Sequence, residues 1–157
     1  MNAIDLRQPT HTEALSPAVQ RYLLDRVRAA TLGGPQQWQI RLYQCLADRR
    51  SAETLCQDLW QFVLEDAQAQ DGLVAVFECP PGEARQEFAP MLWRHLQLLR
   101  ELNPRVCPQG RCSGAAPEED EVPMRIAEQD FELIVMHAEA ERLSRVMPCP
   151  VLIFRRC

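Results

Sequence analysis

The stretch that decides the fold is Phe131-Glu132-Leu133-Ile134-Val135-Met136-His137, which is almost uniformly apolar and ends on a histidine. A short apolar run of this kind is typical of a strand buried in a sheet. A second apolar run, from Val151 to Phe154, follows it closely and is introduced by Pro148-Cys149-Pro150. Open sheets tend to bind ligands at strand ends. The sequence therefore predicts a sheet with a candidate site at His137.

Composition limits the class of protein. The chain has 157 residues, the length of one domain, and a net charge of −5, which argues against a nucleic-acid partner. All 17 basic residues are arginine, so no lysine is present to form a Schiff base. No apolar run approaches the roughly 18 residues of a membrane span, and the N-terminus lacks the pattern of a signal peptide. We therefore expect a cytoplasmic protein with no membrane partner.

The order of the expected elements follows from the hydrophobic periodicity and the turn residues. Residues 1–15 are polar and unpatterned, and we expect them to form a flexible arm before a single domain over residues 16–157. The expected elements are a helix from Ser16-Pro17 to Gly33-Gly34-Pro35, a strand at Trp38–Tyr43, a helix capped by Ser51 and ending near Gln68, a buried central strand at Leu73–Cys79, a helix at about Arg85–Leu102, strands at Val122–Ala127 and Phe131–His137 joined by a turn at 128–130, a short helix or turn at Arg142–Met147, and a last strand at Val151–Phe154.

Residues 103–121 are expected to be one long loop. They contain Cys107 and Cys112 and the acidic run at 118–121. The acidic run is typical of a solvated turn, with a lid or a cation-attracting rim as the alternative. The predicted fold is α/β or α+β, a single layered domain with a mixed sheet of about five strands flanked by about three helices.

Five residues are candidates for chemistry. His137 is either a structural residue or an iron ligand or general base, and Arg142 and Arg145 follow it within two helical turns. The two arginines either pair with neighbouring glutamates or bind carboxylates. His95 lies on the apolar side of its helix. It is either a core residue or a second imidazole that faces one pocket together with His137. His95 and Glu139 are the candidate catalytic residues.

Cysteine chemistry is a weaker possibility. The chain has seven cysteines, an odd number, and no secretion signal, so we do not expect a disulfide framework. Cys45, Cys56 and Cys79 lie in apolar patterns typical of buried thiols. Cys107 and Cys112 form either part of a plain loop or a metal or disulfide pair. No glycine-rich phosphate loop, nucleophile elbow or His-Glu-x-x-His motif is present.

The segment from Met136 to Phe154 resembles the YqcI/YcgG family. That family carries a His-Pro-x-x-Ser-Arg-x-x-Arg segment followed by Pro-x-Pro and a strand ending in Phe. The matching residues in this chain are His137, Arg142, Arg145, Pro148, Pro150 and Phe154. The helix from Phe88 to Leu102 is similar to the family's Phe-x-x-x-Leu-Trp-x-x-Leu-Gln-x-Leu pattern. The likeness covers roughly residues 38–156. The family's N-terminal Phe-Pro-Cys segment and its C-terminal extension have no counterpart, and Ala138 replaces the proline after the site histidine.

The resemblance implies a haem cofactor and an oxygenation, because the family includes haem-dependent N-hydroxylases of guanidine-bearing amino acids. It implies that His137 is the proximal haem ligand and the metal-binding residue. It implies that Arg142 and Arg145 hold the haem propionates or orient the ligand strand. The expected partner is a small-molecule substrate.

Three functions therefore stay open. The first is a small haem-binding, oxygenase-like enzyme of bacterial specialised metabolism, an N-hydroxylase of a guanidine- or amine-bearing molecule. The second is a non-catalytic relative on the same fold that binds a ligand or a partner protein. The third is a redox or metal-binding protein that uses Cys107 and Cys112. A homodimer that completes a pocket is compatible with the small size of the domain.

Overall fold

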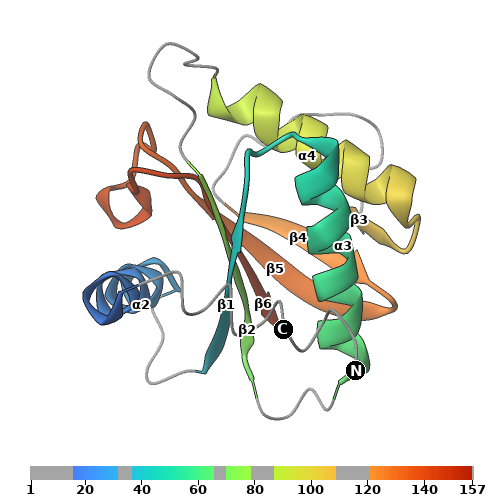
Figure 1. Cartoon of the computed structure of the whole chain (residues 1–157), viewed down its shortest axis with the longest axis horizontal. Coiled ribbons are helices and arrows are strands. Elements are labelled where there is room, and N and C mark those ends of the chain that lie inside the picture. Colours follow the sequence, from blue (N-terminus) through green and yellow to red (C-terminus); the bar gives the residue numbers. More distant parts are fainter. Residues whose placement is uncertain (1–15, 32–36, 66–69, 79–86, 109–120, 157) are drawn as a thin grey trace.

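The computed structural model describes residues 16–31, 37–65, 70–78, 87–108 and 121–156. These residues form a single mixed sheet with helices on both faces (Figure 1). The elements are α2 (Pro17–Thr31), β1 (Trp38–Tyr43), α3 (Arg49–Leu64), β2 (Gly72–Phe77), α4 (Phe88–Leu102), β3 (Val106–Pro108), β4 (Glu121–Ile126), β5 (Gln129–Met136), the 3-10 turn η2 (Leu143–Arg145) and β6 (Val151–Arg156). The six strands lie in the order β1-β2-β6-β5-β4-β3. The predicted α+β single-domain class is confirmed.

The first half of the chain forms a parallel strand pair with a crossover helix. β1 and β2 pair in parallel, and α3 connects them, as parallel strands require. α3 begins at Asp48, whose carboxylate accepts a hydrogen bond from the Ser51 amide at 3.2 Å. The predicted cap at Ser51 is therefore wrong, because the aspartate three residues earlier satisfies the free amide of the first turn and leaves Ser51 buried inside the helix.

The second half forms an antiparallel meander. β2, β6, β5, β4 and β3 pair antiparallel in turn. β4 and β5 are joined at Ala127 and Glu128, whose φ angles of 50° and 70° are those of a tight hairpin turn. The turn is shorter than predicted and β5 starts at Gln129, because a two-residue turn with positive φ matches the twist of its strands.

The predicted loop at residues 103–121 is partly wrong. Val106–Pro108 forms the edge strand β3 and pairs with β4, and Glu121 already belongs to β4. Residues 109–120 of that loop, including Cys112 and the acidic run at 118–120, lie outside the described residues, as does the predicted arm at 1–15.

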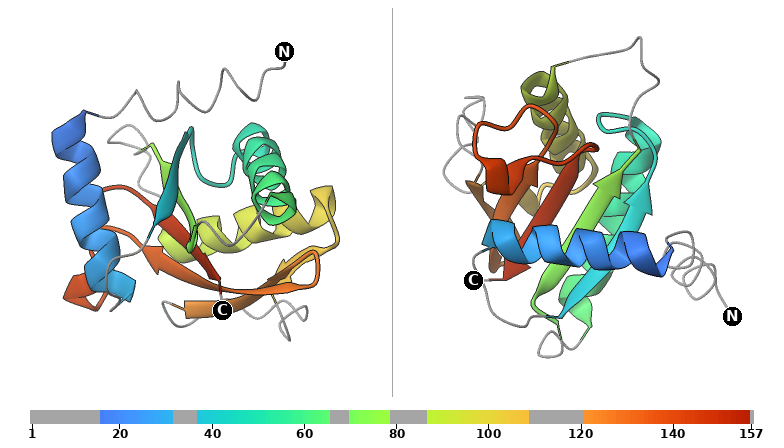
Figure 2. Two further views of the ribbon diagram at one scale, coloured as in Figure 1. Left: turned by 90° about the horizontal axis from the view of Figure 1, so that it is seen from below. Right: turned by 90° about the vertical axis from the view of Figure 1, so that its left-hand side faces the viewer.

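Two helix layers enclose the sheet (Figure 2). α3 and α4 cover one face and pack on Leu73, Ala75 and Phe77 of β2. α2 covers the other face, where Val74 and Val76 lie in its cluster. Adjacent residues of a strand point to opposite faces, so β2 has to be apolar on both. All six of its residues are buried, which confirms the predicted central strand. None of the described helices is long and apolar enough to cross a membrane.

Candidate functional site

His137 lies where the sequence predicts, directly after the end of β5. Its amide donates to the Arg145 carbonyl at 3.1 Å, and its own carbonyl accepts from the Met147 amide at 3.0 Å. The half-buried imidazole stacks on the ring of Phe88 in α4, with centroids 4.1 Å apart and planes inclined by 7°. Its Nδ1 accepts a hydrogen bond from the Glu139 amide at 3.3 Å. The backbone of His137 therefore fixes the segment that follows β5, while its ring is packed against α4.

The strand period decides which face His137 occupies. On β5, Leu133 and Val135 belong to the core under α3 and α4, and Ile134 and Met136 belong to the core under α2. His137 continues the first of these two sets, as its contact with Phe88 of α4 shows. The candidate ligand histidine therefore lies on the α4 face of the sheet.

The other residues predicted at this site are spread around the turn after β5. Arg145 is buried, with 2% of its surface exposed, and forms the end of η2. Arg142 and Glu139 are both exposed. The described contact of Glu139 with His137 is made by its backbone amide, so its carboxylate takes no part in it. The three residues therefore lie in the same turn, but the side chain of Arg145 is buried while those of Arg142 and Glu139 are exposed.

His95 is a fully buried residue of α4. Its Nδ1 accepts a hydrogen bond from the Ala47 amide at 2.9 Å, and its Nε2 is buried without a hydrogen-bond partner in the described part of the chain. The ring meets Phe77 edge-on, with centroids 5.1 Å apart. Burial lowers the pKa of His95 from 6.5 to about 4, and the negative charge of Asp48 opposes this shift only in part. The imidazole is therefore neutral at physiological pH.

One imidazole belongs to α4 and the other packs against it, but the two do not converge. His137 contacts Phe88, and His95 lies seven residues further along the same helix. Seven residues correspond to about 10 Å along a helix axis. Neither histidine lines the hollows of about 540 Å³ and about 410 Å³ that the described residues form beside α2. Those residues also contain no cluster of three or more His, Cys, Asp or Glu side chains suited to a metal ion.

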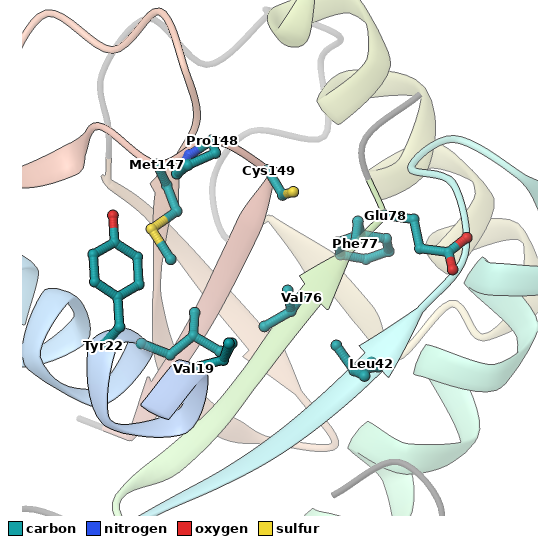
Figure 3. Close-up of a pocket in the computed structure, with 10 residues that line it drawn as sticks. Val19, Tyr22, Leu42, Val76, Phe77, Glu78, Met147, Pro148 and Cys149 are labelled. Carbon is teal, nitrogen blue, oxygen red and sulfur yellow. The ribbon is translucent and has the colours of Figure 1, made fainter. Parts of the chain in front are cut away.

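The larger hollow lies on the other face of the sheet, beneath α2. We call it the apolar pocket; its volume is about 540 Å³. It lies at the carboxyl ends of β1 and β2, the end of a sheet where ligands commonly bind. Its lining residues are Val19, Tyr22 and Leu23 of α2, Leu42, Val76, Phe77 and Glu78 at the strand ends, and Met147, Pro148 and Cys149 before β6. Figure 3 shows Val19 and Tyr22 on α2 and Leu42 and Val76 on the strands.

Sequence reasoning missed this pocket. Val19 and Tyr22 are apolar residues on an otherwise amphipathic helix, and both remain exposed, by 43% and 49%. Apolar residues at helical spacing predict only that one face of the helix packs against the core, not that part of this face lines a pocket. The one available signal is that Tyr22 adds an aromatic residue beside the stripe of Val19 and Leu23, which widens the apolar face beyond what the sheet covers.

The sequence predicts no disulfide framework, but Cys149 forms a disulfide. It lines the apolar pocket and is disulfide-bonded, with a partner that is not among the described side chains. Cys56 is a buried free thiol, as predicted, and burial raises its pKa. Cys45 is free but exposed, because it follows β1 in a turn rather than lying inside an element. Cys79 and Cys112 lie outside the described residues.

The fold and its pocket define a single-domain α+β protein with a mainly apolar hollow at the carboxyl edge of a mixed sheet. The chain belongs to the YqcI/YcgG family, whose model matches residues 29–156. The resemblance inferred from the residues around His137 is thereby confirmed. A search of curated proteins found no similar protein, and a search of solved structures found no similar structure.

Proposed function

We propose that this protein binds a small, mainly apolar molecule in the apolar pocket. The observation that carries the proposal is the hollow of about 540 Å³ at the carboxyl ends of the parallel strands β1 and β2. Small-molecule sites usually measure about 300–1,000 Å³ and are lined mainly by apolar side chains with a few polar groups. Here most lining residues are aliphatic or aromatic, and Tyr22 and Glu78 are the lining residues that carry a hydroxyl and a carboxylate.

The proposal is for binding and does not include a chemical step. The candidate catalytic residues do not support one at this pocket, because His95 packs against Phe77 on the α4 face and Glu139 lies in the exposed turn after β5. The ligand-binding relative is therefore the hypothesis that the described geometry favours.

A neutral, environment-sensitive dye such as Nile red tests the proposal. Wild-type protein is expected to bind the dye with an increase in fluorescence. Val19→Trp places a large ring at the rim of the pocket and is expected to lower the affinity at least about tenfold, since about 1.4 kcal/mol of lost contact suffices. Ala18→Trp is the matched control, because Ala18 is the exposed neighbour that does not line the pocket. Equal binding by both variants and the wild type would overturn the proposal.

Haem binding at His137 is the second candidate, and the family membership favours it. The described residues do not fit it in two respects. An axial histidine normally donates its second ring N–H to a neighbouring acceptor, whereas Nδ1 of His137 accepts the Glu139 amide. A neutral imidazole that accepts a hydrogen bond at Nδ1 carries its proton on Nε2, whereas an iron ligand has to offer an unprotonated nitrogen. In addition, His137 faces α4, away from the apolar pocket. We therefore derive no chemical step through haem.

A further inference from the structure

A second hollow adjoins the apolar pocket. It has a volume of about 410 Å³ and shares Tyr22, Met147 and Pro148 with the apolar pocket. We call it the adjacent hollow. It extends along α2 toward η2, and Arg26 lines it one helical turn after Tyr22. The charged residue among those lining the apolar pocket is Glu78, and the one among those lining the adjacent hollow is Arg26. Because they share three lining side chains, the two hollows lie next to each other.

The guanidinium of Arg26 is positioned but not neutralised by the described residues. Its Nη2 donates to the Leu143 and Val146 carbonyls, both at 2.7 Å, which holds the half-buried side chain against η2. Its Nε is buried without a hydrogen-bond partner. No described carboxylate forms an ion pair with Arg26, and the adjacent Asp25 pairs with Arg28 at 3.8 Å instead.

An arginine that is held in place but not paired with a carboxylate is suited to bind an anionic ligand. Nη1 makes no described hydrogen bond and is not among the fully buried unpaired atoms, so it is at least partly exposed in a residue that lines the hollow. Guanidinium groups bind carboxylates with a planar fork of donors. The two fixed bonds through Nη2 reduce the freedom that Arg26 would lose on binding, which favours a ligand anchored by Nη1.

We infer that the ligand is a molecule with an apolar body and a carboxylate, and that Arg26 binds the carboxylate. This inference rests on the proposed function, since the body would occupy the apolar pocket and the head group the adjacent hollow. Tyr22, Met147 and Pro148 would contact the ligand where the two hollows meet. The α2 residues involved, Tyr22 and Arg26, precede the segment matched by the family model, which begins at residue 29. The inferred carboxylate site therefore includes residues outside the segment that the family model matches.

A pair of probes of equal length tests the inference. The affinities of decanoate and 1-decanol are measured at neutral pH by displacement of the bound dye. The wild type is expected to bind decanoate about tenfold more tightly than 1-decanol, because a guanidinium forms charge-assisted hydrogen bonds with a carboxylate that a hydroxyl group cannot match. Arg26→Gln is expected to reduce this ratio to about one. Arg21→Gln, an exposed arginine of the same helix that lines neither hollow, is expected to keep the ratio.

The outcomes separate the inference from the proposed function. Failure of the dye to bind the wild type overturns the proposed function and the inference with it, whereas failure of both probes to displace a bound dye overturns the inference alone. Equal binding of the two probes, or a ratio that Arg26→Gln leaves unchanged, overturns the inference alone. If Arg26→Gln does not fold, salt provides a second measurement on the wild type. Decanoate binding is then expected to weaken from low to high ionic strength while 1-decanol binding does not. A preference for decanoate that salt does not change would also overturn the inference.

Discussion

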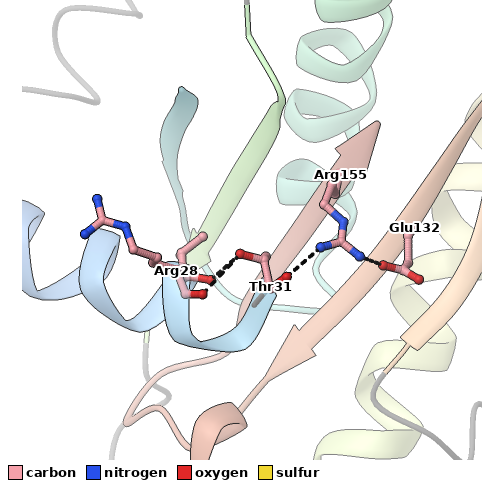
Figure 4. Close-up of polar contacts among 5 residues, drawn as sticks. Arg28, Thr31, Glu132 and Arg155 are labelled. Atoms are coloured by element: carbon pink, nitrogen blue, oxygen red, sulfur yellow. Dashed lines mark hydrogen bonds and ion pairs between the residues drawn. The ribbon is translucent and has the colours of Figure 1, made fainter. Parts of the chain in front are cut away.

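Arg155 on β6 donates from Nη1 to the carbonyl oxygen of Thr31, the last residue of α2, at 2.9 Å (Figure 4). Its Nη2 also binds the carboxylate of Glu132 on the neighbouring strand β5. A cation at the end of a helix satisfies a free carbonyl and interacts favourably with the helix dipole. α2 carries one wall of the apolar pocket, so this contact ties the wall to two central strands.

We predict that Arg155→Met lowers the free energy of unfolding by about 2 kcal/mol, because it removes a charged hydrogen bond and leaves Glu132 without its cation. Methionine keeps the apolar stem of the side chain. Arg125→Met is the control, since the pair between Arg125 and Asp130 is about half exposed and contributes less than about 1 kcal/mol. Denaturant unfolding measures both values. Equal losses in the two variants would show that Arg155 is only another surface cation.

His95 makes stability depend on pH. Its pKa is lowered by burial from the ordinary histidine value of 6.5 to about 4 in the native state, so between these values the unfolded chain binds a proton that the native chain does not. Native stability is therefore expected to fall as the pH drops from about 6.5 to about 4, by up to about 3 kcal/mol.

The variant His95→Gln tests this origin of the pH dependence, because glutamine can accept the Ala47 amide but does not titrate. Urea unfolding of both proteins between pH 5 and pH 7 is expected to give a steeper loss for the wild type. Parallel profiles would show that other groups cause the dependence.

Gly72 is the first residue of β2 and has no room for a side chain. A Cβ atom there would lie 2.6 Å from Cζ3 of Trp38 and closer still to the carbonyl oxygen of Phe154. The carbonyl belongs to a paired strand and cannot move without disturbing the β2–β6 register. Gly72→Ala is therefore expected to lower the free energy of unfolding by about 1–3 kcal/mol, measured by thermal or denaturant unfolding. An unchanged midpoint would contradict this close approach of the strands.

The haem hypothesis can be decided by absorbance. The described surroundings of His137 predict that added haem gives the same spectrum with the wild type and with His137→Ala. His137→Gln is a companion variant, because it keeps a polar side chain beside Phe88. A Soret band that the wild type develops and both variants lose would instead support His137 as an iron ligand and place the cofactor on the α4 face.

The strands and helices could be predicted from the sequence where the signal is local. The cap of α2 is one case, since Ser16 accepts the Val19 amide at 3.2 Å and Pro17 starts the helix. Competing groups nearby caused the errors. Two residues suited to capping, Asp48 and Ser51, lie at the start of α3, and periodicity does not distinguish between them. The strand at Val106–Pro108 has three residues, too few to show any alternation.

The sequence by itself determined the two-sided apolar strands, the family and the position of His137 at a strand end, because these depend on residue types a few positions apart. Only the tertiary structure decided which side of the sheet each side chain faces and what α2 covers. Those properties depend on strand pairing and on helix docking between residues far apart in the chain. His137 and the apolar pocket therefore share an edge of the sheet but lie on its opposite faces.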